Sequence, residues 1–120
     1  EEDDIEDIKK SLNSKVKHFS GIINDIINPD TSVRSMHRSN SFDETEKSEL
    51  YDLYKKLEYL EAYYDLTELT IDDKKNIDYI NEWIVVWNNN LPFLKKVMNR
   101  LKDSWKEKEN NEREFIGYLG

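Results

Sequence analysis

Residues 50–64 read LYDLYKKLEYLEAYY, and their apolar side chains recur at alternating steps of three and four residues. At about 100° per residue, these steps place the apolar positions on one face of an α-helix. The positions on this face are Leu50, Leu53, Leu57, Leu60 and Tyr64. The preceding SFDETE offers two N-cap candidates, Ser41 and Asp43, each with a glutamate three residues later. The sequence therefore predicts a helix over residues 43–66.

Two further stretches, one on either side of this helix, carry stripes of the same spacing. The first predicts a helix over residues 3–28, which opens with acids suited to a helix N-terminus and ends before Pro29. Its stripe consists of Ile5, Ile8, Leu12, Val16, Phe19, Ile22, Ile23, Ile26 and Ile27. The second predicts a helix over residues 71–90, with Thr70 as its N-cap. Its stripe consists of Ile77, Ile80, Ile84, Trp87 and Leu91.

A fourth stripe follows the break NNNLPF, in which Pro92 suits the first turn of a new helix. The stripe consists of Leu94, Val97, Met98, Leu101, Trp105, Phe115, Ile116 and Leu119. The polar run KEKENNERE interrupts it, yet Lys108 and Glu112 fall on the same face and the apolar residues resume in register. We expect one continuous helix over residues 92–118. The alternative is a helix that frays after Trp105, with its last apolar residues packed separately.

Four helices with one apolar stripe each bury those stripes only against one another. The expected fold is all-α, a four-helix bundle formed by a single domain over residues 1–120. We expect a mostly antiparallel arrangement, because short connections join the second helix to the third and the third to the fourth. One long linker, residues 29–42, separates the first two helices. It either runs along the bundle as a crossover or hangs loose at one end.

Composition excludes several classes of protein. The chain has no cysteine, so disulfides, thiol nucleophiles and cysteine-ligated metals are excluded. No apolar run approaches the roughly 18 residues of a membrane span. The net charge of −8 is uneven, with −2 in residues 1–40, −8 in residues 41–90 and +2 in residues 91–120. Without a concentrated basic surface, no direct binding of nucleic acid is expected. The first residue is Glu1 rather than methionine, which favours an excised domain over a processed product.

Sequence patterns that carry catalysis or hold a metal are also missing. Neither His18 nor His37 lies three residues after a glutamate, so the Glu-x-x-His pair of di-iron bundles is missing. The sequence contains no His-Glu-x-x-His and no glycine loop that would cradle a phosphate. The carboxylates fall on polar faces, where nothing separates their pKa values for acid–base work. We therefore expect neither an enzyme nor a metal or cofactor site.

Residues 34–41, RSMHRSNS, form the one stretch of the predicted linker that combines basic and hydroxyl side chains without an acid. The simplest interpretation is a polar connection between helices. An arginine three residues before Ser41 also resembles the substrates of basophilic kinases. A phosphate on Ser41, at the N-cap of the next helix, would order the linker against Arg34 or Arg38. Ser41 is thus a candidate phosphorylation site.

Aromatic residues make up 12% of the chain, more than a minimal bundle needs. Tyrosine and tryptophan favour interfaces, because each offers a large rigid area together with one hydrogen-bonding group. The candidate partner-binding residues on the second and third predicted helices are Tyr51, Tyr59, Tyr63, Tyr79, Trp83 and Val86. The alternative is that a wide apolar stripe marks a helix in contact with three others, and that the tyrosines lie half exposed on the flank of the bundle.

Three functions are compatible with these features. The leading hypothesis is a non-enzymatic helical module that binds another protein or itself as a homodimer. A polar substitution of Trp83 or Tyr59 should then weaken association and leave helicity nearly intact. The second is an acidic inhibitor or antitoxin-like protein that occupies a basic, nucleic-acid-binding surface of its partner, through the −8 of residues 41–90. The third is an exported or surface-displayed helical domain, suggested by the first residue and the absence of cysteine.

Overall fold

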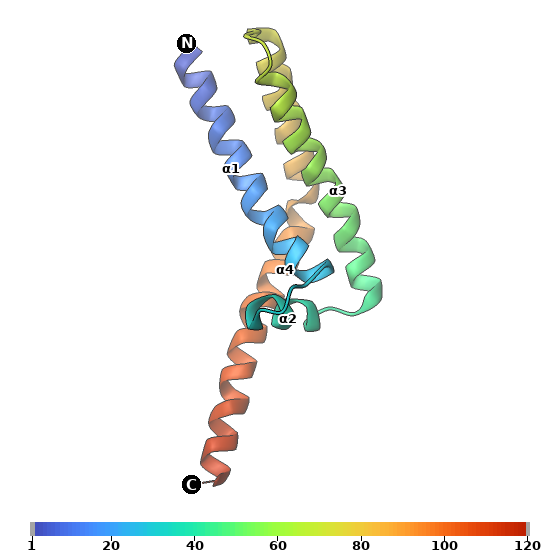
Figure 1. Cartoon of the computed structure of the whole chain (residues 1–120), viewed down its shortest axis with the longest axis vertical. Helices are drawn as coiled ribbons and strands as arrows, with labels where there is room; N and C mark the ends of the chain where they lie inside the picture. Colours follow the sequence, from blue (N-terminus) through green and yellow to red (C-terminus); the bar gives the residue numbers. More distant parts are fainter. Residues whose placement is uncertain (1, 120) are drawn as a thin grey trace. The chain divides into compact units, whose positions relative to one another are not determined.

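The computed structural model of the chain describes the backbone of residues 2–119 and the side chains of residues 4–106. Over these residues the protein is all-α, with four helices and no strand (Figure 1). The helices are α1 (Glu2–Ile27), α2 (Val33–Asn40), α3 (Glu44–Thr67) and α4 (Asp73–Leu119). The chain forms two compact units, of which the first ends at Asn90 and the second begins at Leu91. The predicted all-α bundle is confirmed.

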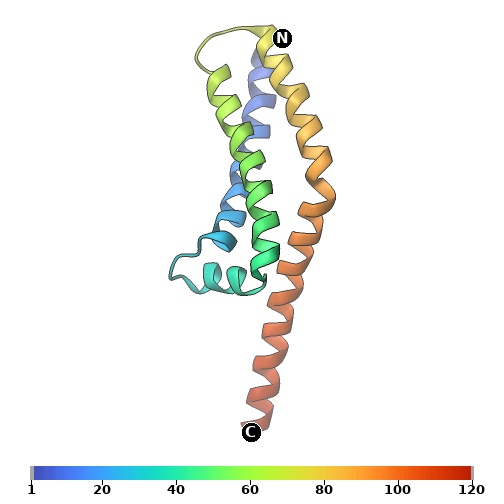
Figure 2. The same ribbon diagram turned by 90° about the vertical axis from the view of Figure 1, so that its right-hand side faces the viewer.

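The first unit is built from α1, α2, α3 and the part of α4 before Leu91. Lys9 and Ser20 of α1 bond to Glu68, the C-cap of α3, and to Glu58 within α3, so these two helices run side by side in opposite directions (Figure 2). Along α4, by contrast, Asn76 bonds to Lys9 and Trp87 contacts the ring of Phe19, so α4 runs in the same direction as α1. The leucine stripe predicted for α3 is buried as expected, at Leu50, Leu53, Leu57 and Leu60.

The predicted linker over residues 29–42 neither runs along the bundle as a crossover nor hangs loose at one end, because it contains α2, which is bonded to α1. Ser32 caps this helix by accepting a hydrogen bond from the backbone N–H of Ser35. Two side chains attach it to the end of α1. Ser35 Oγ donates to the carbonyl of Asp25, and Arg38 lies 2.8 Å from the Asp25 carboxylate. The sequence pattern predicted solvated serines in a polar connection. In the structure Ser32 caps α2, and Ser35 and Ser39 are buried.

The start of α3 decides between the two predicted N-caps. Asp43 accepts from the backbone N–H of Glu46, and the Glu46 carboxylate accepts from the N–H of Asp43, which completes a capping box. Ser41 is the C-cap of α2 instead, and its hydroxyl donates to the carbonyl of His37 at 2.9 Å. The N-cap prediction is correct for Asp43 and wrong for Ser41.

The predicted break between the third and fourth helices is wrong for the backbone, because α4 continues through Pro92 for 47 residues in all. Proline has no N–H for the carbonyl four residues earlier, which costs about 3 kcal/mol inside a helix. The boundary between the compact units nevertheless falls at the predicted break, between Asn90 and Leu91. Thr70 is also not the N-cap, since the side chain of Asp72 accepts from the N–H of Lys75.

The continuous helix predicted through residues 106–114 is confirmed for the backbone, which stays helical to Leu119. The side chains of Lys108 and Glu112, predicted to cross the stripe, lie outside the described residues. In the described part of the second unit, Ser104 Oγ donates to the carbonyl of Leu101, and Lys102 Nζ donates to Asn99 Oδ1. These contacts are local to the helix.

The buried face of α4 in the first unit is turned by about one residue from the predicted stripe. The buried positions are Asn76, Tyr79 and Trp83. Ile77 and Ile84, which were predicted to be central to the stripe, are about half exposed. The three buried side chains still follow the helical spacing of three and four residues, so the period was correct and the phase was wrong.

In the first half of α1, too, the buried face is turned from the predicted stripe. Lys9 and Asn13 are buried, whereas Ile8 is about half exposed. Later in the helix the predicted members Val16 and Ile23 are fully buried. Polar side chains therefore occupy the interior at one end of the first unit, and apolar ones occupy it further along α1.

Candidate interaction surface

The six predicted partner-binding residues separate into two groups in the structure. Tyr51 and Tyr59 are each 51% exposed. Tyr63 and Val86 are partly exposed. Tyr79 and Trp83, in contrast, are 0% and 5% exposed and belong to the interior of the first unit. The structure thus removes these last two residues from the candidate surface.

Tyr59 and Val86 lie on neighbouring helices and line one hollow between α3 and α4, with a volume of about 640 Å³. The remaining lining residues are Asp52, Lys55, Lys56, Asn89 and Asn90. Lys56 Nζ donates to Asn90 Oδ1 at 3.3 Å, which ties the two helices together beside the hollow. Charged groups of both signs and two amides therefore surround the side chains of Tyr59 and Val86.

Tyr59 is connected to the interior by a series of ring contacts. Its ring meets that of Tyr63 edge to face at 6.0 Å between centroids, and Tyr63 meets the buried Tyr79 at 5.3 Å. Such pairs add about 0.5–1.5 kcal/mol beyond area burial. Because Tyr79 is fully buried, the ring at the surface is held by a packed core and loses little further freedom on binding.

Tyr51 lines a second hollow, of about 500 Å³, where the end of α1 meets the start of α3. Its ring stacks on that of Tyr54 at 6.5 Å, and Lys55 Nζ lies 5.0 Å from the Tyr51 ring centroid. The structure therefore places Tyr51 and Tyr59 on the same helix but in different hollows.

Acidic side chains concentrate beside these tyrosines. On the α1 side of α3, Ser20 Oγ donates to Glu58 at 2.8 Å. Burial, with the adjacent Glu58 carboxylate, raises the pKa of Glu61 from 4.5 to about 7. On the α4 side, burial raises the pKa of Tyr63, and the nearby Asp78 and Glu82 add to the effect. Carboxylates thus lie on both flanks of α3.

The raised pKa of Glu61 leads to a pH dependence of stability. Since the folded state holds this proton more tightly than the unfolded state, the group contributes stability that is present below about pH 4.5 and is lost as pH rises through about 7. We expect Glu61→Gln to increase the free energy of unfolding at about pH 8 by roughly 1–2 kcal/mol and to flatten its dependence between those values. Urea unfolding at a series of pH values measures this. The same slope in Glu61→Gln as in the parent would contradict it, and Glu49→Gln on the exposed side of α3 is the control.

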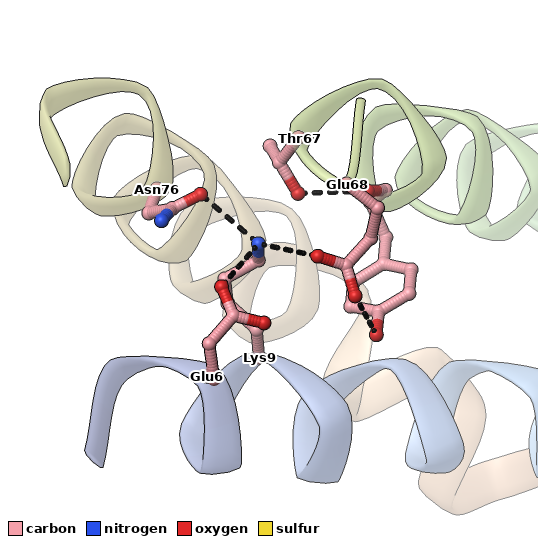
Figure 3. A network of polar contacts seen from close by, with 6 residues as sticks. Glu6, Lys9, Thr67, Glu68 and Asn76 are labelled. Carbon is pink, nitrogen blue, oxygen red and sulfur yellow. Dashed lines mark hydrogen bonds and ion pairs between the residues drawn. The ribbon is translucent and has the colours of Figure 1, made fainter. Parts of the chain in front are cut away.

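A fully buried lysine is the centre of a polar cluster in the first unit (Figure 3). Lys9 Nζ lies 3.2 Å from Glu6 Oε1, 3.2 Å from Glu68 Oε2 and 3.0 Å from Asn76 Oδ1. Tyr64 donates its hydroxyl proton to the other oxygen of Glu68 at 2.7 Å. Burial and this Glu68 partner raise the pKa of Tyr64 to about 12. The cluster joins α1, α3 and α4.

The sequence reasoning missed this cluster, because it placed the stripe of α1 on the isoleucines alone. One signal was present. The residues Lys9, Asn13, Val16, Ser20 and Ile23 follow steps of four and three, the same period as the isoleucines. Two sets of residues on α1 therefore had the spacing of a buried face. In the first half of the helix the more polar set is the one that is buried.

Ser41, the candidate phosphorylation site, does not lie where the sequence placed it. A phosphate there would stand at the C-terminal end of α2, where the helix dipole is unfavourable to an anion. Arg38, one of its two proposed partners, already pairs with Asp25. Phosphorylation of Ser41 stays a prediction without the N-cap geometry that motivated it.

The part of the chain that the structure describes contains neither a cluster suited to a metal ion nor a helix suited to a membrane. No cluster of three or more histidine, aspartate or glutamate side chains there is arranged to hold a metal ion. No described helix is both long enough and apolar enough to span a membrane. Compared with protein-family models, characterised proteins and solved structures, the chain finds no match.

Proposed function

We propose that the chain is a non-enzymatic helical module that binds another protein through the exposed face of α3 and the adjoining face of α4. The observation that carries this proposal is the hollow between Tyr59 and Val86. A half-exposed aromatic ring held from behind by Tyr63 and Tyr79 is the kind of preorganised anchor that dominates binding energy. The contributing residues are Tyr51, Tyr59, Tyr63 and Val86.

The residues that line the hollow indicate which chemical groups a partner would need. An apolar side chain would fit against Tyr59 and Val86, while Asn89 and the lysines offer hydrogen bonds and charge at the rim. An amphipathic segment has this combination of groups. The segment belongs either to a second copy of the chain, which would give a homodimer, or to another protein.

The substitution Tyr59→Ser tests this function. It removes the anchor from a half-exposed position, so we expect at least about a tenfold loss of affinity with little change in helicity. Sedimentation over a range of concentrations measures self-association, and quantitative capture from the native host measures binding to another protein. Ile71→Ser is the matched control, because Ile71 is 90% exposed and lies away from the hollow. Equal association of the parent and Tyr59→Ser would reject the surface.

A second candidate function rests on a separate observation, the acidic flanks of α3. Glu58 and Glu61 on one side, with Asp78 and Glu82 near Tyr63 on the other, would attract a basic surface such as one that binds nucleic acid. Binding of this kind weakens steeply with added salt, whereas binding centred on Tyr59 does not. Affinity measured against salt concentration, in the parent and in Tyr59→Ser, therefore separates the two functions.

A further inference from the structure

The face of α3 that lines the hollow continues as an exposed apolar stripe toward the end of the helix. Tyr59, in the hollow, is 51% exposed, and Leu66 is 62% exposed. Tyr63 lies between them and is partly exposed. The three residues follow steps of four and three, which keeps them within an arc of about 60° on the helix. An aliphatic side chain exposed to water therefore shares one helix face with the aromatic ring of the hollow.

Leu66 lies too far along α3 to reach the hollow of its own chain, since it is two helical turns, about 10 Å, beyond Tyr59. A second copy of the chain in the antiparallel orientation can supply this side chain instead. When the two α3 helices lie side by side and are centred between residues 62 and 63, Leu66 of each copy is level with Tyr59 of the other. Ala62 at this centre is exposed, and its small side chain lets the helices approach closely.

The charges along α3 favour the antiparallel orientation over the parallel one. Lys55 and Lys56 line the hollow, together with Asp52. Residues 65–73, around and after Leu66, include no lysine or arginine and four acids, which are Asp65, Glu68, Asp72 and Asp73. In the antiparallel arrangement this acidic segment of each copy lies level with the two lysines of the other. A parallel arrangement would instead bring the two acidic segments together, which like charges disfavour.

We propose that the occupant of the hollow is a second copy of this chain, in an antiparallel dimer whose two-fold axis passes beside Ala62. Leu66 of each copy packs against Tyr59 and Val86 of the other. This inference rests on the proposed function, because it gives that same hollow a defined partner. A two-fold interface is self-complementary, so every contact is made twice and association stops at the dimer.

Sedimentation of the full chain over a range of concentrations tests the occupant. We expect the parent to dimerise, and Leu66→Ser to raise the dissociation constant of the dimer by about a hundredfold, since a roughly tenfold loss occurs at both hollows. Ile71→Ser is the control and should keep the parent constant, because Ile71 is 90% exposed but lies beyond Glu68, the C-cap of α3, and so outside the stripe. A parent that stays monomeric, or a Leu66→Ser dimer as tight as that of the parent, would overturn the proposal.

Single cysteines test the orientation independently, because the chain has no cysteine of its own. A disulfide requires two Cα atoms within about 7 Å of each other. Ala62→Cys lies beside the two-fold axis, so mild oxidation should link it into covalent dimers. Thr45→Cys, at an exposed position near the start of α3, is the control, because in the dimer it would lie about 50 Å from its counterpart. Equal cross-linking of the two variants would overturn the antiparallel arrangement.

Comparison of Leu66→Ser with Tyr59→Ser separates this inference from the proposed function. If both substitutions weaken the dimer, the hollow and its occupant are both supported. If Tyr59→Ser weakens the dimer and Leu66→Ser does not, the hollow is a binding site but Leu66 is not its occupant, and the inference fails alone. If neither substitution weakens the dimer, the inference and the proposed function fail together.

Discussion

Lys9→Ala is expected to lower the free energy of unfolding by about 3 kcal/mol. The lysine is fully buried and holds Glu6, Glu68 and Asn76 together from three helices. Its removal leaves a cavity and an unpaired amide oxygen on the buried Asn76. The two carboxylates are more than a third exposed, so water solvates them and keeps the loss below the largest values known for buried charges.

Two variants separate the contributions to this loss. Lys9→Met fills most of the volume, so its cost should be about 1 kcal/mol, from the amide of Asn76 alone. Lys10→Ala, at the exposed neighbouring position, should change the stability by no more than about 0.5 kcal/mol. Urea unfolding at neutral pH measures all three. A loss for Lys9→Ala as small as that for Lys10→Ala would mean that the cluster does not stabilise the bundle.

Trp83→Ser should lower the free energy of unfolding by about 4 kcal/mol, because it removes a large side chain from the core. Trp83 is 5% exposed and stacks on Trp87 with 4.8 Å between ring centroids. The expectation that a polar residue at this position would weaken association and leave the helices intact therefore no longer holds. We expect a loss of cooperative helical signal on mild heating, measured by circular dichroism.

Tyr59→Ser is the matched comparison for this variant, because both remove an aromatic ring in favour of the same small side chain. Tyr59 is half exposed, so its loss should reduce the stability by about 1 kcal/mol only. Similar melting curves for Trp83→Ser and Tyr59→Ser would show that the burial of Trp83 contributes nothing to folding. The two substitutions thus separate a core role from a surface role.

The elements that could be predicted from sequence are those in which one local signal is sufficient. The stripe of α3 consists of leucines, and no second set of residues at the same spacing competes with it. The buried face of α3 was therefore assigned correctly. Asp43 and Glu46 form a reciprocal cap that depends on neighbouring residues only. The exposure of Tyr51 and Tyr59 follows from their position opposite that stripe.

The errors arise where a polar contact between distant segments selects among local alternatives. Ile77 and Tyr79 differ by two positions on α4, and either phase gives a helical stripe. The bond between Asn76 and Lys9, 67 residues apart in the chain, belongs to only one of these phases. Ser35 of α2 misled for a related reason, since its hydroxyl donates to the carbonyl of Asp25 on another helix.

The contacts of Lys9 also limit how α1 and α3 can align. Apolar side chains are interchangeable, so a stripe of leucines tolerates a shift by one or two turns at small cost. The ammonium group does not, because after such a shift it would be buried without the carboxylate of Glu68. The Lys9 contacts at one end of the first unit thus fix the longitudinal alignment of its helices. The buried leucines further along stabilise the packing of the helices but do not select that alignment.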